Sequence, residues 1–375
     1  MKYLFLFTIF YSSLLYSSDK CNRVYLARDK WDLNYKNMPN YDQGATNTCY
    51  AYTAIQLMDY WRLTHGLRIT KNIALSDPMY AAYLFKKYSF ANKLGSLVNL
   101  IGKPTHTPLD FGLIQSIIDE IRKYGMCTDL AVSKSIENYA RKIGVTPGTL
   151  LEVINYLFGH FNAIKRDREW YKKVLSTNPE KFNNRFRNYF CRYGLQRNLC
   201  REALKVYDVI TPYFAKGKAI KLYDEIFKEC QKPENKYLIT KKMPSPKTYT
   251  LRPAKWVKKK IIKSLNRKNP QPVGITYCMD VLMNSDHVGL SRINFPKKNC
   301  GLHASIIIGK RERNGRCEFF LKNTGGEDCS FYDDTWECVL HRGIKYNKWS
   351  GGGRSHGIWI DAHQLSRNII QFTYF

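Results

Sequence analysis

The sequence is poor in acidic residues, has no Cys-x-x-Cys pair, and has no long apolar run beyond its N-terminus. Its 31 Asp and Glu stand against 60 Lys and Arg, which gives a formal net charge of +29. Because structural zinc is commonly held by closely spaced cysteines, we expect no metal site. We also expect no cofactor. Because a membrane-spanning helix needs about 20 apolar residues, we expect no transmembrane span in the mature chain.

The first residues have the pattern of a secretory signal. Lys2 precedes an apolar stretch over residues 4–10, and Ser17 and Ser18 supply small residues for cleavage. We therefore predict a signal peptide over residues 1–18 and a secreted or periplasmic protein. Tyr16 is a poor fit to a cleavage site after Ser18, so the cleavage position and an uncleaved membrane anchor stay open.

The cysteine count agrees with export. Eleven cysteines leave an even ten if one remains outside a disulfide, as expected in an oxidising compartment. Ten reduced, buried cysteines are the alternative. Cys191 with Cys200, and two of Cys317, Cys329 and Cys338, are close enough in sequence to form local pairs, whereas the remaining connectivity is open.

Cys49 is the strongest candidate for a catalytic residue. Apolar residues follow it at the three-to-four-residue spacing of a helix: Ala51, Ala54, Ile55, Met58 and Trp61. A helix that begins here presents its positive end to the sulfur and favours the reactive thiolate. Gln43 lies six positions upstream. Its amide and the backbone N–H of Cys49 could stabilise an oxyanion, which indicates acyl transfer. A lone cysteine without these neighbours is usually a buried apolar residue or half of a disulfide.

A candidate base lies in the last third of the chain. Residues 301–309 and 318–326 have the composition of strands, and Asn314-Gly315 between them is a strong turn signal. An antiparallel hairpin with Gly309 opposite Cys317 places Asn323 opposite His303, on one face of the sheet. An amide there can orient the imidazole. The main alternative base is His287, ahead of His341 and His356.

These residues resemble the papain-like cysteine peptidases, whose pattern is a Gln, a Cys six residues later that opens a helix, then a distant His and Asn on strands. The resemblance implies that Cys49 is the nucleophile, His303 the general base and acid, Asn323 its orienting residue and Gln43 the oxyanion-hole donor. It also implies a thiol protease with an α+β, two-lobed fold that acts on proteins or peptides. Weaker matches are Leu75-Ser76, the segment 111–125 and the strand 357–360.

The chain departs from the family in both catalytic segments. Thr46-Asn47-Thr48 and Tyr50 replace the usual Cys-Gly-Ser and Trp, so the loop disulfide expected from that earlier cysteine cannot form. Thr324-Gly325-Gly326 replaces the usual Ser-Trp-Gly, so the Trp that shields the Asn–His contact is missing. The alternatives are therefore a catalytically weakened papain-fold binding protein of the cell envelope or exterior, and an exopeptidase of the same family.

Cys49 and His303 lie 254 residues apart, farther than in the papain-like family, so the resemblance implies an insertion between them. We predict a helical lobe with the nucleophile over 19–127, a helical insertion over 128–247, and a β-rich lobe with the His and Asn over 248–375. Helix patterns dominate the middle segment, for example around Leu150-Leu151 and Ala203-Leu204.

The basic character predicts an acidic partner. Residues 160–205 alone contain twelve Lys or Arg against four acids. Electrostatic adhesion to anionic cell surfaces is the preferred interpretation, and specific nucleic-acid binding is the disfavoured one.

Overall fold

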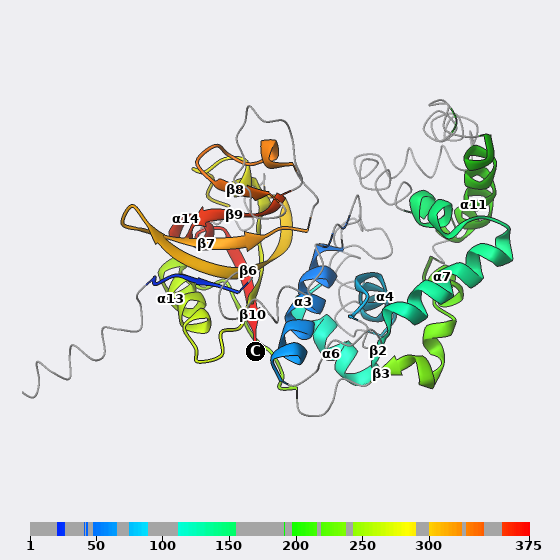
Figure 1. Cartoon of the computed structure of the whole chain (residues 1–375), viewed down its shortest axis with the longest axis horizontal. Helices are drawn as coiled ribbons and strands as arrows, with labels where there is room; N and C mark the ends of the chain where they lie inside the picture. Colours follow the sequence, from blue (N-terminus) through cyan, green and yellow to red (C-terminus); the bar gives the residue numbers. More distant parts are fainter. Residues whose placement is uncertain are drawn as a thin grey trace, which may run out of the picture. The chain divides into compact units, whose positions relative to one another are not determined.

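The computed structural model describes a helix-rich part and an antiparallel sheet (Figure 1). The described residues are 21–26, 41, 43, 48–65, 75–88, 112–154, 191, 197–215, 219–237, 243–289, 300–324, 328–340 and 355–375. The predicted signal peptide and most of the basic stretch 160–205 lie outside these residues. The chain divides into two compact units. The β unit comprises 1–42, 52–68 and 243–375, and the helical unit comprises 43–51 and 69–242.

The β unit is built on one eight-stranded sheet in which every pairing is antiparallel. The strands follow the order β4-β10-β5-β6-β7-β9-β8, and β1 pairs with the far end of β6. Their bounds are β1 Val24–Tyr25, β4 Lys247–Thr250, β5 Val273–Cys278, β6 Leu302–Arg313, β7 Arg316–Lys322, β8 Glu337–Leu340, β9 Ser355–Asp361 and β10 Ile369–Tyr374. The long β6–β7 hairpin therefore lies at the centre of the sheet, where β-branched and aromatic residues are buried.

In the described part of this unit, helices α13, over Ala254–Leu265, and α14, over Ala362–Ser366, lie against the sheet. Helix α13 packs against α14, β6 and β10 through apolar side chains such as Val257 and Ile261. The carboxylate of Asp361 caps the start of α14 by accepting from the backbone N–H groups of His363 and Gln364. The short 3-10 turns η5 and η6 cover Met279–Leu282 and Cys329–Phe331.

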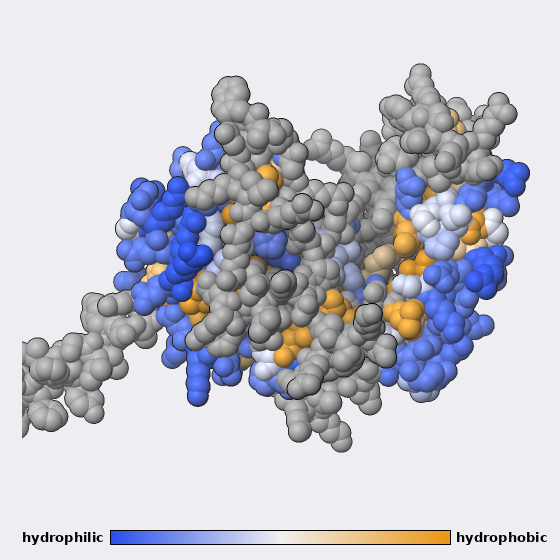
Figure 2. Space-filling view, in the orientation of Figure 1, coloured by the Kyte–Doolittle hydropathy of each residue, from blue (hydrophilic) through white to orange (hydrophobic). Residues whose placement is uncertain are grey.

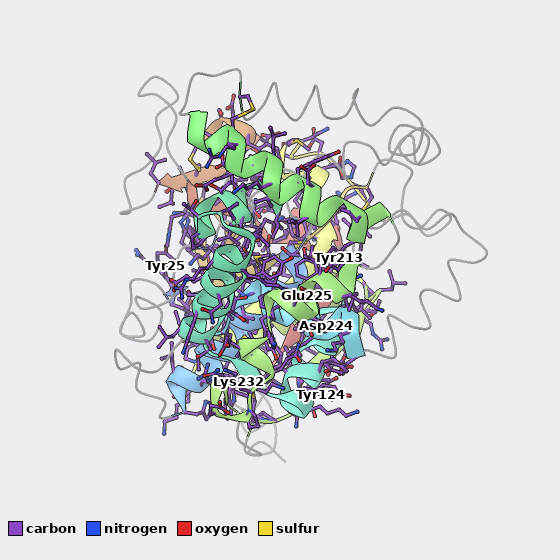
Figure 3. All side chains as sticks on the ribbon, turned by 90° about the vertical axis from the view of Figure 1, so that its right-hand side faces the viewer. Tyr25, Tyr124, Tyr213, Asp224, Glu225 and Lys232 are labelled. Carbon is purple, nitrogen blue, oxygen red and sulfur yellow. A yellow bond between two sulfur atoms is a disulfide. The ribbon has the colours of Figure 1, made fainter. Side chains whose placement is uncertain are left out.

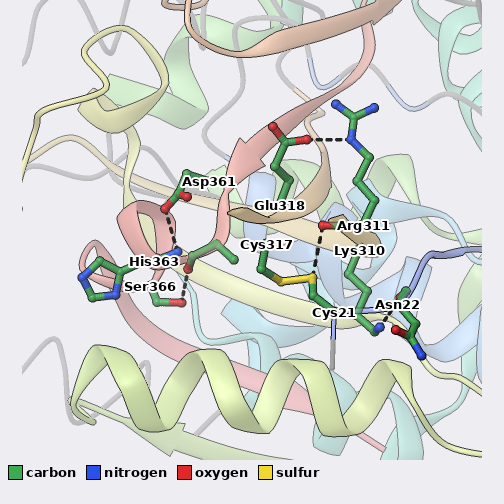
Figure 4. Close-up of a disulfide and its surroundings, with 10 residues drawn as sticks. Cys21, Asn22, Lys310, Arg311, Cys317, Glu318, Asp361, His363 and Ser366 are labelled. Atoms are coloured by element: carbon green, nitrogen blue, oxygen red, sulfur yellow. Dashed lines mark hydrogen bonds and ion pairs between the residues drawn. A yellow bond between two sulfur atoms is a disulfide. The ribbon is translucent and has the colours of Figure 1, made fainter. Parts of the chain in front are cut away.

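The N-terminal segment is fastened to the β6–β7 hairpin (Figure 4). A disulfide joins Cys21 to Cys317, and the backbone N–H of Leu26 donates to Ile308 O at 3.0 Å. The buried Lys310 donates from Nζ to the backbone O of Asn22. Burial lowers the pKa of Lys310 to about 8. A two-residue strand thus becomes part of the core, because a covalent bond and backbone pairing act together.

The described part of the helical unit contains the first residues of α3, several further helices and one small ribbon. The helices are α4 Pro78–Tyr88, α6 Ile114–Tyr124, α7 Asp129–Ile143, α11 Arg197–Ala215 and α12 Ala219–Ile226, and residues 147–154 are helical too. The 3-10 turns are η3 Glu229–Gln231 and η4 Pro233–Asn235, and the ribbon pairs β2 Met126–Cys127 with β3 Lys236–Tyr237. Tyr80, Tyr83 and Phe227 pack as one aromatic group with ring centroids 5.3–5.7 Å apart. The segment after residue 128 therefore shares its core with α4.

Polar contacts join α7, α11 and α12 at the surface of this unit. Tyr213 Oη donates to Glu225 Oε1 at 2.7 Å, and Lys142 Nζ lies 3.1 Å from Glu225 Oε2 (Figure 3). The start of α7 is capped by Thr128, whose Oγ1 accepts from the N–H of Ala131 at 3.1 Å. Hydrophilic residues predominate on the coloured surface over this part of the chain (Figure 2).

Ten of the eleven cysteines form five disulfides, as the even remainder predicts. The local pairs Cys191–Cys200 and Cys329–Cys338 were within the predicted set. The other three pairs are Cys21–Cys317, Cys127–Cys230 and Cys278–Cys300. The mixed helical and antiparallel architecture confirms the α+β class, and the papain-like plan stays a prediction. Among the described residues, no helix has both the length and the apolar character needed to cross a bilayer.

Candidate active site

Cys49 is the first residue of α3, which spans Cys49–Thr64, and it is the one cysteine that forms no disulfide. It is half-buried. The neighbouring Tyr50 is 2% exposed and packs edge-on against Phe85, with ring centroids 5.8 Å apart. A Cβ at Gly112 would lie 2.2 Å from the Tyr50 ring, so this position admits only glycine. The start of the helix is thereby held by packing within the helical unit.

Helix α3 is buried along its length rather than on one face. The predicted apolar positions Ala51, Ala54, Ile55, Met58 and Trp61 are all at most 7% exposed. Polar groups on its other sides are buried too: Arg62 lies 2.6 Å from Asp59, and Gln56 Nε2 donates to Tyr52 O at 3.1 Å. A helix that is enclosed on every side is a rigid support for its first residue.

Gln43 is half-buried. The residues between it and Thr48 lie outside the described part of the chain, so its predicted role as an oxyanion donor stays a prediction.

His303 is the second residue of β6 and is 5% exposed. It pairs across the sheet with Tyr277 of β5, and the two rings meet edge-on with centroids 5.9 Å apart. Burial lowers the pKa of His303 below its ordinary value of 6.5, and the hydrogen bond to Asn323 acts in the opposite direction. Burial is the larger effect, so the ring is favoured in its neutral form at neutral pH.

Asn323 follows β7 and is the hydrogen-bonding partner of His303. The distance from His303 Nε2 to Asn323 Oδ1 is 2.6 Å. The same oxygen accepts from the backbone N–H of Thr324 at 2.9 Å and from Ser305 Oγ at 3.3 Å. The amide nitrogen donates to Tyr332 Oη at 3.3 Å. Asn323 is 9% exposed, so this network is largely protected from water.

The network determines which ring nitrogen of His303 carries the proton. A backbone N–H can only donate, so the atom of Asn323 that faces Thr324 must be the oxygen. An amide oxygen can only accept, so His303 Nε2 must carry its proton. In the neutral ring, Nδ1 is then the atom with a lone pair, and it is the nitrogen able to accept a proton. Nδ1 is therefore the ring nitrogen through which His303 could act as a base.

The predicted register of the hairpin is wrong, although the predicted contact is present. Cys317 lies opposite Glu312, not Gly309, because Asn314 and Gly315 form a two-residue turn with φ of 50° and 72°. The sums of paired residue numbers are 629 next to the turn and 628 beyond an irregularity between Ile307 and Gly309. The bulge shifts the pairing by one residue, so His303 and Asn323 stay on the same face of the hairpin. Asn323 lies two residues away from the position directly opposite His303.

Sequence reasoning missed the residues that hold Asn323 in place, Ser305 and Tyr332. Ser305 lies two positions after His303 on the same strand, so the alternation of a strand could have identified it. Its Oγ lies 3.1 Å from Tyr277 Oη. Tyr332 follows the turn η6 and had no local signal. The Ser305 and Tyr332 hydroxyls therefore both contact the amide of Asn323.

Lys322 is a third residue that the sequence reasoning missed. It ends β7 next to Asn323 and is 2% exposed. Burial lowers its pKa to about 7. Lys322 pairs with Ile306 across β6, so its side chain lies on the face opposite to that of Asn323.

The alternative bases have less support than His303. His341 lies outside the described residues. His287 is half-buried, and its Nε2 has no hydrogen-bond partner among the described residues. His356 packs against Phe320, with ring centroids 5.8 Å apart. The structure brings together His303 and Asn323 of the predicted set; Cys49 and Gln43 belong to the helical unit, and their approach to His303 stays a prediction.

In the part of the chain that is described, no group of three or more His, Cys, Asp or Glu is placed to hold a metal ion. No protein-family model matches the chain, and no curated protein matches it significantly in sequence.

Proposed function

We propose that the chain is an exported cysteine peptidase of papain-like plan, in which Cys49, His303, Asn323 and Gln43 form the active site. The observation that carries the proposal is the hydrogen bond from His303 Nε2 to Asn323 Oδ1, which directs a basic Nδ1 away from the amide. The position of the one cysteine outside a disulfide, at the first residue of a buried helix, supports it further. The five disulfides support export to an oxidising compartment.

In the proposed reaction, the Cys49 thiol transfers its proton to Nδ1 of His303, and the thiolate attacks the carbonyl carbon of a peptide bond. The oxyanion that forms accepts hydrogen bonds from the Gln43 amide and the backbone N–H of Cys49. His303 then returns the proton to the leaving amine, and a thioester remains. Water, deprotonated by Nδ1, attacks the thioester, and the acid product leaves as the thiol is restored.

A binding role without turnover is the second candidate. The observation that favours it is the burial of His303, which is 5% exposed and has a lowered pKa. Such an imidazole takes up a proton less readily than an exposed one, so it stabilises a thiolate–imidazolium pair less well.

The test compares the native chain with Cys49→Ala, Cys49→Ser and His303→Gln on casein and on a peptide library. The proposal predicts cleavage by the native chain, and a loss of about 100-fold or more in kcat/KM for each variant, since each removes a reacting group. A vinyl-sulfone probe should label the native chain at Cys49 and should not label Cys49→Ala. Labelling without cleavage would favour the binding role. Failure of the folded chain to react with the probe would overturn the assignment of the nucleophile.

A further inference from the structure

Helix α13 and the residues before it carry a concentration of positive charge that the proposed reaction does not use. Between Leu251 and Lys268 the chain has eight Lys or Arg and no acidic residue, and no Asp or Glu occurs anywhere from Asn235 to Met279. The cations are Arg252, Lys255, Lys258, Lys259, Lys260, Lys263, Arg267 and Lys268. No acidic residue within this stretch offsets its positive charge.

The helix displays these charges on one side. Val257, Ile261 and Leu265 are at most 1% exposed and face the sheet, whereas Lys255, Lys259 and Lys263 recur every four residues and are exposed. Of the elements packed against α13, α14 and β10 contain no acidic residue, and β6 contains one, Glu312. Among the described elements packed against α13, the positive charges therefore outnumber the acids.

An apolar side chain stands at the start of this basic side. Leu251 is 54% exposed and has a φ of 51°, in the left-handed region that leucine rarely adopts. Its backbone N–H donates to Ile370 O at 2.8 Å, which fixes the position of the residue at the end of β4. The fold thus holds a large apolar group in solvent in an unfavourable conformation, beside Arg252.

Aromatic rings flanked by cations continue the same surface. Trp256 of α13 is half-buried and meets Tyr249 with ring centroids 5.1 Å apart. Arg252 and Lys260 lie 5.7 Å and 5.1 Å from the centre of the Trp256 ring. Tryptophan and tyrosine beside lysine and arginine are typical of surfaces that sit at the headgroup level of a bilayer.

We propose that Leu251, Trp256 and the basic side of α13 form a docking surface for an anionic phospholipid bilayer. The lysines and arginines attract the acidic headgroups, and Leu251 enters the boundary between headgroups and acyl chains. A soluble polyanion would match the charges but would offer nothing to an exposed leucine, so the two observations together favour the bilayer. The surface would hold an exported enzyme at a membrane without a transmembrane segment.

The test measures co-sedimentation of the full chain with vesicles of phosphatidylcholine containing 30% phosphatidylglycerol, and with pure phosphatidylcholine, at about 0.1 M salt. Every variant carries the same residues 1–20, so a difference between variants reports on the substituted positions. We expect tighter binding to the anionic vesicles than to pure phosphatidylcholine, and a loss of about 100-fold on Lys255→Gln with Lys263→Gln and Lys268→Gln, since each charge contributes about five-fold. The matched control, Lys134→Gln with Lys205→Gln and Lys221→Gln in the helical unit, should keep binding within about three-fold.

Leu251→Asn provides the decisive arm, because asparagine tolerates a positive φ and the variant should unfold at the same temperature as the native chain. We expect it to bind anionic vesicles about five- to ten-fold more weakly and to bind a single-stranded oligonucleotide unchanged. An equal loss of vesicle binding in the two triple-lysine variants would overturn the proposal, since binding would then depend on the net charge of the chain and not on this surface. Unchanged vesicle binding by Leu251→Asn, with tight oligonucleotide binding, would replace the bilayer with a soluble polyanion.

Discussion

Replacing Asn323 with alanine should damage both the stability of the β unit and the orientation of His303. The amide oxygen of Asn323 accepts from three donors, His303 Nε2, Ser305 Oγ and the backbone N–H of Thr324. All four residues are at most 9% exposed, so water replaces the lost acceptor poorly. Alanine has no side-chain acceptor, so all three donors would lose this partner.

The expected cost follows from the price of unpaired buried donors. Each one costs about 1–3 kcal/mol, and the Ser305 hydroxyl can turn toward Tyr277, whose Oη lies 3.1 Å away. Two donors then remain unpaired, which predicts a loss of about 2–6 kcal/mol in the free energy of unfolding. Since the ring also loses the group that fixes its proton on Nε2, kcat/KM on a peptide substrate should fall about 10- to 100-fold.

The assay is denaturant unfolding with activity measured in parallel, and Ser305→Ala is the matched control. The control leaves the amide of Asn323 in place and removes only the hydroxyl that contacts Asn323 and Tyr277, so it should cost about 1–2 kcal/mol and preserve most of the activity. Nitrogen NMR of the imidazole should show a proton on Nε2 in the native chain and in Ser305→Ala, and a mixture of tautomers in Asn323→Ala. A native chain with its proton on Nδ1, or equal destabilisation by the two variants, would refute the reasoning.

Two further predictions concern stability alone. Burial lowers the pKa of Lys322 from 10.5 to about 7, so the unfolded chain binds more protons above pH 7 and stability rises with pH. Between pH 7 and 8 the rise should be about 1 kcal/mol, and Lys322→Met should abolish it in urea unfolding curves; a rise of the same size in Lys322→Met would assign it to other groups. The Cys127–Cys230 disulfide closes a loop of 103 residues, so replacing both cysteines with serine should cost about 5 kcal/mol, against about 3 kcal/mol for Cys191–Cys200 with its separation of 9. Calorimetry that finds equal losses would contradict the loop-length argument.

Much of the local structure could be predicted from the sequence. The apolar spacing after Cys49 correctly placed a helix that begins at that residue, because packing on a regular helix leaves a periodic signature. The strands around His303 and Asn323 were identified from composition and from the Asn314-Gly315 turn. The local disulfide Cys191–Cys200 followed from its short separation.

The remaining features depend on contacts between distant segments. The disulfide Cys21–Cys317 joins residues 296 positions apart, and no local pattern specifies such a pair. The bulge near Ile308 has no sequence signal, yet it decides which face of the hairpin His303 shares. Tyr332 reaches the Asn323 amide from a separate turn, so its role emerges only in the folded chain.

The most direct test of the central claim is the pH dependence of alkylation at Cys49. All ten other cysteines are in disulfides, so iodoacetamide applied to the native chain should react at this residue alone. If Cys49 and His303 form a catalytic pair, rapid alkylation should persist well below the ordinary thiol pKa of about 8.5. His303→Gln should then move the rise in rate up toward that value. Identical profiles for the native chain and His303→Gln would contradict the account.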